Sequence, residues 1–325
     1  MRGFVFFLVL CVSTAVKADA ASTIPDLLLQ MQAALQNLNY HGTLVYLHEG
    51  QVQSMRIVHQ ADEQGEREHL INLNGPGREV LRHNDEVTCY IPDQKVVMVG
   101  QRQLAGHMLS KIADNDFQAL QAVYDFSLAE AGRVAGRNTQ RINILPKDSF
   151  RYGYRLWLDK DTSLLLGSDL LGDDGEILEQ TMFADISIVE HIPPTMFSPV
   201  TDSSGFNWYR EDSTGEPPPK VDSAWRVADL PAGFSVSGRY RHPLPETSEP
   251  AEHWVISDGL STVSIYIETL PEGKPSFQGV SRMGVMNVYG ALIADHQITV
   301  IGDVPASTVE AIAAAVSLGS ADSPQ

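Results

Sequence analysis

Cysteine is almost absent from the 325-residue sequence, which contains only Cys11 and Cys89. Cys11 lies in an amino-terminal segment that we expect to be removed, so the mature chain cannot form an intrachain disulfide. Cys89 lies in an alternating strand pattern at 87–91, where a buried and inert thiol is the usual case. Burial of apolar side chains, rather than covalent cross-linking, must therefore hold the fold together.

Long apolar runs are absent after the first 20 residues. The chain starts with Met1 and Arg2, continues with an apolar run at 4–12, and then presents the small-x-small pattern Ala18-Asp19-Ala20. The apolar run is too short to cross a bilayer, which needs about 20 apolar residues. These features predict a cleavable signal peptide at 1–20, export from the cytoplasm and a mature chain that does not span the membrane.

Positive charge is also scarce, with 23 Lys and Arg against 41 Asp and Glu and a net charge of −18. Such a surface repels nucleic acid, because affinity for nucleic acid comes mainly from neutralising phosphates. We therefore expect no nucleic-acid partner.

Motifs for catalysis and metal binding are missing as well. The sequence has no Gly-x-Ser-x-Gly elbow and no phosphate-binding loop, and its 10 histidines are dispersed at spacings that match no zinc site. The acidic pairs Asp173-Asp174 and Glu211-Asp212 have turn or linker composition. We expect neither an enzyme nor a bound metal or cofactor.

The residues that are present predict two domains. Thr23 and Asp26 resemble a capping box before an amphipathic helix at 24–38, and 41–100 reads as an antiparallel meander. A mainly helical stretch at 103–128 precedes further strands, in which Tyr152, Tyr154, Leu156 and Leu158 share one face and Met182, Ala184, Ile186 and Ile188 share another. Asp174-Gly175 supplies a hairpin turn. Residues 21–200 should form a large, curved, unclosed antiparallel sheet covered by helices, with an apolar concavity.

A second, smaller α+β domain is expected at 225–318, so the fold class is α+β. Ser, Gly, Asp and the run Pro217-Pro218-Pro219 mark 201–224 as a linker. Strands are predicted at 234–240, 253–257, 262–268, 284–289 and 297–301, followed by a helix at 305–317. Residues 319–325 should form a flexible tail.

A local excess of positive charge is the main candidate for a binding site. Six basic residues fall at 133–155, and alternating strands could bring several of them onto one rim beside the apolar concavity. Such a rim suits an amphiphile with an anionic head group, because arginine binds phosphate bidentately; a solvated polar face is the alternative. The predicted lipid contacts are Arg133, Arg137, Arg141, Arg151, Arg155, Tyr154, Trp157, Met98, Phe117 and Tyr124.

Several strings of the sequence resemble one family over essentially the whole mature chain. They are Arg133-Val134-Ala135-Gly136-Arg137, Pro146-Lys147-Asp148, Arg151-Tyr152-Gly153-Tyr154-Arg155-Leu156-Trp157-Leu158-Asp159, Leu164-Leu165-Leu166, Asp229-Leu230-Pro231-Ala232-Gly233-Phe234, Ser257-Asp258-Gly259-Leu260 and Gly302-Asp303-Val304-Pro305. The sequence resembles the MucB/RseB family of periplasmic regulators of an extracytoplasmic-stress sigma factor.

The resemblance implies an amino-terminal domain shaped like the lipoprotein carriers LolA and LolB and a smaller domain that binds a partner. It implies that the chain binds the periplasmic region of a transmembrane anti-sigma factor of the MucA/RseA kind and shields it from proteolysis. Lipopolysaccharide or another lipid would release that grip. The resemblance suggests partner contacts in the smaller domain, for which we select Arg239, Tyr240, Arg241, Arg282, Met283 and Tyr289.

Two other functions stay open at this point. The amino-terminal architecture alone would suit a periplasmic carrier of lipids or lipoproteins, whereas such a carrier has no need for the second domain. A lipid hydrolase has no motif in its favour. The sequence leaves open whether the chain forms a homo-oligomer.

Overall fold

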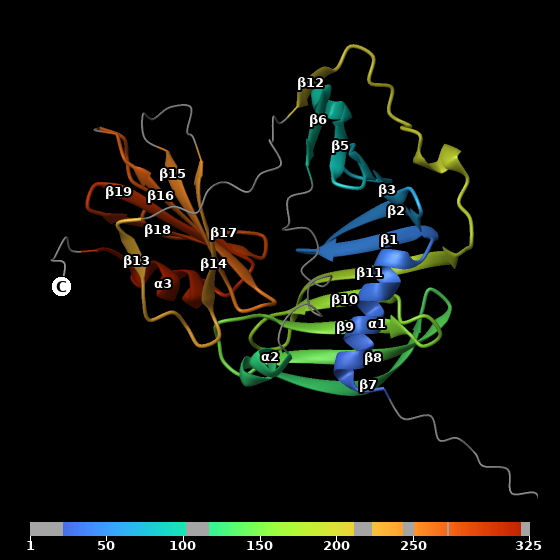
Figure 1. The fold of residues 1–325 in the computed structure, drawn as a ribbon, viewed down its shortest axis with the longest axis horizontal. Coiled ribbons are helices and arrows are strands. Elements are labelled where there is room, and N and C mark those ends of the chain that lie inside the picture. Colours follow the sequence, from blue (N-terminus) through green and yellow to red (C-terminus); the bar gives the residue numbers. More distant parts are fainter. Residues whose placement is uncertain (1–21, 102–116, 211–222, 243–249, 272, 320–325) are drawn as a thin grey trace, which may run out of the picture.

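Two large β-sheets and a two-stranded one organise the chain in the computed structural model, which describes residues 22–101, 117–210, 223–242, 250–271 and 273–319 (Figure 1). The larger sheet has 12 strands in the order β12-β6-β5-β4-β3-β2-β1-β11-β10-β9-β8-β7. Its strands are β1 Tyr40–His48, β2 Gln51–Asp62, β3 Gly65–Asn72, β4 Glu79–His83, β5 Glu86–Ile91, β6 Val96–Gln101, β7 Tyr124–Val134, β8 Arg137–Pro146, β9 Gly153–Asp159, β10 Leu165–Leu171, β11 Ile177–Ile188 and β12 Asn207–Arg210. The predicted large, unclosed sheet is confirmed.

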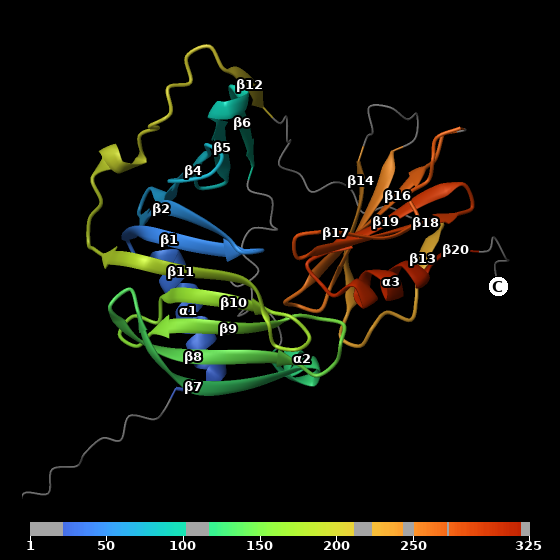
Figure 2. The same cartoon turned by 180° about the vertical axis from the view of Figure 1, so that it is seen from behind.

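Helix α1, Ile24–Asn37, crosses one face of this sheet, which we call the inner face (Figure 1). Its predicted capping box is present, since the Asp26 amide donates to the Thr23 hydroxyl and the Thr23 amide donates to the Asp26 carboxylate. The helix buries Leu28 and Met31 in a core that includes Leu156. Figure 2, turned by 180°, shows the opposite face of strands β7 to β11, which we call the outer face.

The predicted helix at 103–128 is wrong in its second half, and its first half lies outside the described residues. Helix α2 covers only Phe117–Val123, and Tyr124 and Leu128 belong to strand β7. Leu120 and Tyr124 are four residues apart and fit a helix, but from Tyr124 onward the chain pairs with β8. A four-residue spacing also keeps two strand residues on one face, so this pattern did not distinguish the two structures.

A β-bulge changes the predicted face of β11. Tyr152, Tyr154, Leu156 and Leu158 are all buried, as expected. In β11, however, Thr43 of β1 faces Asp185 while Leu44 faces Phe183, so Ala184 has no partner in the ladder. The predicted common face is therefore wrong for Ala184, which is exposed while Phe183 turns into the core, and for Met182, which lies on the outer face with Trp157 through their shared neighbour Gly167.

The smaller sheet has the order β14-β15-β16-β19-β18-β17, and α3, Ala306–Ala314, packs on β18 and β19. Its strands are β14 Ser235–His242, β15 Ala251–Ser257, β16 Thr262–Thr269, β17 Gly279–Met283, β18 Met286–Ile293 and β19 His296–Gly302. The helix ends three residues before the predicted position. Val316 instead lies in β20, Val316–Leu318, which pairs with β13, Trp225–Val227.

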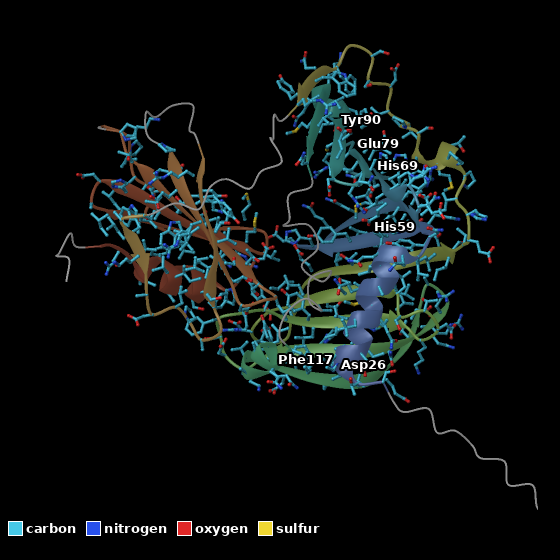
Figure 3. All side chains as sticks on the ribbon, in the orientation of Figure 1. Asp26, His59, His69, Glu79, Tyr90 and Phe117 are labelled. Carbon is cyan, nitrogen blue, oxygen red and sulfur yellow. The ribbon has the colours of Figure 1, made fainter. Side chains whose placement is uncertain are left out.

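The segment after β11 runs along the outer face of strands β3 to β6. It contains the short 3-10 helix η3, Pro194–Phe197, whereas η1, Pro92–Gln94, lies between β5 and β6. His69 and Glu79 of β3 and β4, labelled in Figure 3, hold this segment at Met196 and at Val200. Within the predicted linker 201–224, β12 pairs in parallel with β6, so the start of that range belongs to the large sheet rather than to a free spacer.

Candidate functional site

An apolar row crosses five strands on the inner face of the large sheet. The register aligns Ile57, Leu70, Val80, Cys89 and Met98 on β2 to β6 as successive cross-strand neighbours. Exposure increases along the row, from buried Ile57 to Met98, whose side chain is 52% exposed. A row of adjacent apolar side chains on the concave side of a sheet suits an acyl chain.

The predicted basic rim forms only in part, because the register of β8 and β9 places Arg137, Arg141 and Arg155 on the outer face of the sheet, away from the apolar concavity. Arg137 donates to Asp159 at 2.7 Å, and Arg155 lies 3.7 Å from Asp169. Arg141 is the cross-strand neighbour of Trp157 on the outer face. Arg133 is exposed near the end of β7. Two of the three arginines on the outer face are therefore engaged in ion pairs, and none of the three faces the inner side of the sheet.

The predicted aromatic contacts are also divided. Tyr154 points to the inner face and is buried in the core under α1, whereas Trp157, three residues later, points to the outer face and is only partly buried. Phe117 begins α2 and packs against Phe126, with ring centroids 4.8 Å apart. Of the predicted lipid contacts, Met98 lies in the apolar row.

Arg151 and Tyr124 lie at the junction between the two domains. The expectation that Arg151 belongs to an exposed rim is wrong, because its side chain is 0% exposed and pairs with Asp258 of the smaller domain at 2.9 Å. The Tyr124 hydroxyl donates to the same carboxylate at 2.9 Å. Burial, followed by the charge of Asp258, raises the pKa of Tyr124 far above its ordinary value, so this hydroxyl stays protonated.

Each domain contributes side chains to the core of the other. Leu260 and Val285 of the smaller domain belong to the core cluster under α1 and α2. Phe150, from the turn between β8 and β9, packs against the core of the smaller domain. The two domains therefore share a continuous apolar contact in addition to the Arg151–Asp258 pair.

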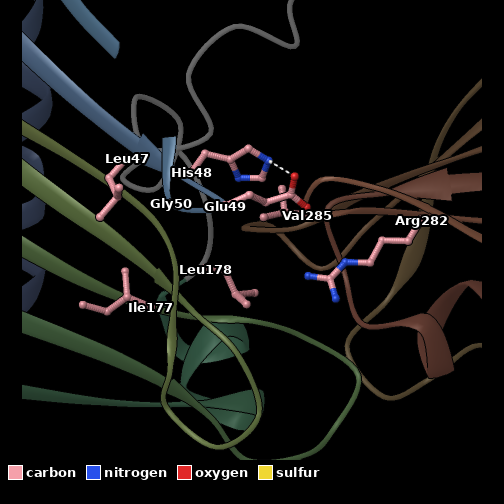
Figure 4. A pocket seen from close by; sticks show the side chains of 8 residues that line it. All are labelled: Leu47, His48, Glu49, Gly50, Ile177, Leu178, Arg282 and Val285. Carbon is pink, nitrogen blue, oxygen red and sulfur yellow. Dashed lines mark ion pairs between the residues drawn. The ribbon is translucent and has the colours of Figure 1, made fainter. Parts of the chain in front are cut away.

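A pocket of about 270 Å³ opens between the domains, and we call it the junction pocket (Figure 4). One wall comes from the end of β1, the following turn and the start of β11, and the other comes from β17 and the turn before β18. Its lining residues are Leu47, His48, Glu49, Gly50, Ile177, Leu178, Arg282 and Val285. Pockets that combine apolar walls with a few charged groups at a domain boundary are typical binding sites.

Charged groups cluster at the back of the junction pocket. The His48 ring lies 3.3 Å from the Glu179 carboxylate, which also accepts a hydrogen bond from the Tyr46 hydroxyl at 2.6 Å. Burial, together with the charge of Glu179, raises the pKa of Asp303. Arg282 reaches the pocket from the other wall, with its Nε donating to the Gly284 carbonyl at 2.7 Å.

The predicted partner contacts lie on two opposite edges of the smaller sheet. Arg239, Tyr240 and Arg241 are on edge strand β14, whereas Arg282 and Met283 are on edge strand β17. Arg239 stacks over the ring of Trp254, with its guanidinium carbon 3.9 Å from the ring centroid. Tyr289 is partly buried against the core. Only the β17 group lies at the junction pocket.

Sequence reasoning missed His48, Asp258 and Val285 as members of the site. Asp258 stood in one of the strings shared with the family, Ser257-Asp258-Gly259-Leu260, which reads as a turn. Its contact with Arg151 joins residues 107 positions apart. No local spacing signals such a contact, because it depends on how the two domains pack.

Among residues 22–101, 117–210, 223–242, 250–271 and 273–319, no three His, Cys, Asp or Glu side chains are placed to hold a metal ion. Within the same part of the chain, no helix has the length and apolar character to cross a membrane.

Family models match both domains. The model of the MucB/RseB N-terminal domain matches residues 23–201, and that of the MucB/RseB C-terminal domain matches residues 219–317. Together they cover most of the chain.

Similar proteins include two regulatory proteins and a solved structure that contains one of them. The chain is 30% identical to the sigma-E factor regulatory protein RseB of Salmonella typhimurium over 93% of its own length and 92% of the relative. It is 30% identical to the sigma factor AlgU regulatory protein MucB of Pseudomonas aeruginosa over 97% of this chain and 98% of that one. The MucA/MucB complex structure from Pseudomonas aeruginosa aligns with a TM-score of 0.71 at 27% identity, covering 91% of this chain and 99% of the other.

Proposed function

The chain belongs to the MucB/RseB family, and from this premise we propose that it is a periplasmic negative regulator of an extracytoplasmic-stress sigma factor. It binds the periplasmic region of a transmembrane anti-sigma factor and protects that region from regulated proteolysis. Binding of lipid or lipopolysaccharide releases the anti-sigma factor. The observation that carries the proposal is similarity over both domains to proteins named as sigma-factor regulators, one of which is solved in complex with MucA.

The junction pocket supports the anti-sigma part of the proposal. It places exposed Arg282 next to apolar walls from the larger domain, and exposed Met283 is the next residue of β17. A polypeptide segment bound there would contact both domains at once, so its affinity would depend on their relative position. The predicted contacts on β14 lie on the opposite edge of the smaller sheet and are the alternative area for this partner.

Two exposed arginines on opposite edges of the smaller sheet test which edge the partner uses. We expect Arg282→Glu to weaken binding of a purified anti-sigma periplasmic fragment at least about tenfold, which corresponds to about 1.4 kcal/mol. Arg241→Glu on β14 is the matched control and should change the affinity less than about twofold. Isothermal titration calorimetry measures both. The reverse order of effects would move the main contact to β14, and no binding by the unmodified chain would refute the proposed partner.

The apolar row supports the lipid part of the proposal. Its five side chains present a continuous apolar strip on the inner face, and Met98 at its end is accessible. An acyl chain lying along this strip would remove apolar surface from water on both molecules. The head group would then lie beyond the edge of the strip.

A charged residue in the apolar row should weaken this binding strongly. We expect Met98→Glu to reduce the affinity for a fluorescent fatty-acid analogue by about tenfold or more, because a carboxylate is costly to bury beside acyl carbon. Val52→Glu provides the control, since Val52 is 55% exposed but points to the outer face of β2. Equal losses in the two variants would contradict a site on the inner face.

A periplasmic lipid or lipoprotein carrier is the second candidate, and the apolar row is the observation that favours it. A carrier would bind the amphiphile without any effect of the anti-sigma fragment. A regulator requires the reciprocal effect, in which each ligand weakens the other by the same factor. Titrating the fatty-acid analogue with and without the fragment separates the two functions.

A further inference from the structure

The turn between β8 and β9 inserts a fully buried arginine between the two domains. Arg151 donates from Nε to Asp148 at 3.0 Å, from Nη1 to Asp258 at 2.9 Å and from Nη2 to the Ala232 carbonyl at 2.6 Å. The first acceptor belongs to the larger domain and the other two belong to the smaller one. One guanidinium group therefore joins three chain segments through directed hydrogen bonds.

The acceptor side of this contact is equally constrained. Oδ1 of Asp258 accepts the backbone amides of Leu260 and Ser261 at 2.9 and 2.7 Å, while Oδ2 accepts Arg151 and Tyr124. The carboxylate is therefore fixed within its own turn and cannot follow Arg151 if the larger domain rotates. Because both charges are enclosed, separating the domains would leave each of them without its partner until water enters.

Aromatic rings and a glycine enclose the arginine from the sides. Its guanidinium carbon lies 5.4 Å from the ring centroid of Tyr124 and 4.9 Å from that of Phe234, one ring from each domain. Gly233 has a φ of +82°, and a Cβ added there would lie 2.9 Å from Val123. The chain of the smaller domain thus approaches the larger domain at a place where only glycine fits without a shift.

The same turn makes further contacts that lead toward the junction pocket. The Thr308 hydroxyl donates to the Phe150 carbonyl at 2.7 Å, and Asn287 donates to the Tyr152 hydroxyl at 3.2 Å. Asn287 lies in β18, two residues after Val285, which lines the pocket. Residues 148–152 are thus connected through β18 to the pocket wall that the smaller domain supplies.

We propose that Arg151 and Asp258 are positioning residues that hold the two walls of the junction pocket at a fixed distance and angle. Arg282 and Val285 face Leu47 and Leu178 only while this interdomain pair is closed. The effect on binding rests on the proposed function, in which the anti-sigma segment binds the closed arrangement of the two domains. Opening the pair separates the walls and lowers the affinity without changing any residue of the pocket.

The first experiment measures the domain arrangement without any ligand. Spin labels are placed in mature full-length protein at two exposed positions, Asn138→Cys in the larger domain and Leu292→Cys in the smaller one, in a Cys89→Ser background. Pulsed electron resonance then gives the distribution of the distance between them. Asp258→Asn keeps the shape of the side chain and removes its charge, and Arg151→Lys keeps the charge and removes the fork of donors.

We expect a narrow distance distribution in the parent protein and a broadened or shifted one in both variants. Arg210→Gln is the matched control, because Arg210 pairs with Glu86 at the surface of the larger domain, at 3.0 Å, with both side chains more than half exposed. Hydrogen exchange of β9 and β16 verifies that each domain remains folded. An unchanged distribution in folded Asp258→Asn protein would overturn the proposal.

The second experiment measures binding of the anti-sigma periplasmic fragment to the same proteins. We expect Asp258→Asn to weaken binding at least about fivefold and Arg210→Gln to leave it unchanged. Equal affinity in Asp258→Asn and parent protein, with a broadened distance distribution, would refute the positioning role. If the parent protein itself fails to bind the fragment, the proposed function fails, while the distance measurement still decides whether the pair holds the domains.

Discussion

At the scale of single residues, Asp169 on β10 is a carboxyl group whose side chain is only 1% exposed. Burial raises its pKa, although a hydrogen bond from Gln180 at 2.7 Å and the nearby Arg155 partly offset that effect. When burial raises the pKa of an acid, the protonated form of that acid favours the folded state. Its contribution to stability is fully present below the unfolded-state pKa and is lost as pH rises through the folded-state pKa. At neutral pH the ionised carboxylate therefore lowers the stability of the protein.

We expect Asp169→Asn to increase the free energy of unfolding by roughly 1 kcal/mol at pH 7, because the amide carries no charge to bury. The gain should shrink toward pH 4, where the parent carboxyl becomes protonated. Urea unfolding at several pH values measures it, with exposed Asp173→Asn as the control. A loss of stability at pH 7 would show that the ion pair with Arg155 outweighs burial.

A sequence pattern predicts whether a residue is buried better than it predicts which residue it contacts. Alternation placed Tyr154 and Leu156 on one face of a strand, and both are buried. The same alternation should have placed Trp157 on the opposite face from Tyr154. Arg151 was assigned to an exposed rim because charged residues are almost never fully buried without a partner, and Asp258 is distant in sequence. Its burial depends on domain packing, which no local pattern reports.

At the scale of elements, the segment 192–201 is fixed to the outer face of the large sheet by two buried side chains. Glu79 accepts the backbone amides of Val200 and Thr201, each at 2.8 Å, and it pairs with His69 at 2.6 Å. The other ring nitrogen of His69 lies 2.7 Å from the Met196 carbonyl. Both ring nitrogens of His69 therefore lie within hydrogen-bonding distance of an oxygen atom.

We expect Glu79→Gln to lower the free energy of unfolding by about 2–4 kcal/mol at pH 7, because His69 loses its buried partner. Burial opposes ionisation of Glu79, but hydrogen bonds from Thr201, Val200 and His69 outweigh it and lower its pKa. The contribution of the Glu79 carboxylate to stability is therefore present above its unfolded-state pKa and is lost as pH falls through its folded-state pKa. Thermal unfolding from pH 7 to pH 3 measures the shrinking difference, and exposed Glu63→Gln is the control. A difference that grows in acid would contradict this account.

Element type was predictable where two independent signals agreed. The capping residues Thr23 and Asp26 and the apolar spacing both indicated α1, which begins at Ile24. For residues 124–128 the apolar spacing was the only signal and gave the wrong element. Strand β12 could not be predicted, because its four residues are exposed and only pairing with β6 makes them a strand.

At the scale of the whole molecule, the two domains share their cores across the junction. We expect Phe150→Ala to lower the free energy of unfolding by about 2–3 kcal/mol and to increase hydrogen exchange in the smaller domain, although Phe150 belongs to the larger one. Phe277→Ala is the control, because Phe277 is 38% exposed and removal of its ring should lower the free energy of unfolding by less. Hydrogen exchange followed by mass spectrometry locates the effect. Increased exchange confined to the larger domain would contradict the shared core.

The placement of Leu260 and Val285 under the larger sheet also affects how the protein can be made. A polypeptide is synthesised from its amino terminus, so residues 24–200 emerge well before these two side chains are available. During that interval Tyr124 and Tyr152 lack the neighbours that cover them in the finished molecule. Newly made chains are therefore most open to aggregation or to a chaperone just before their last hundred or so residues arrive, and a truncation before Leu260 would prolong that state.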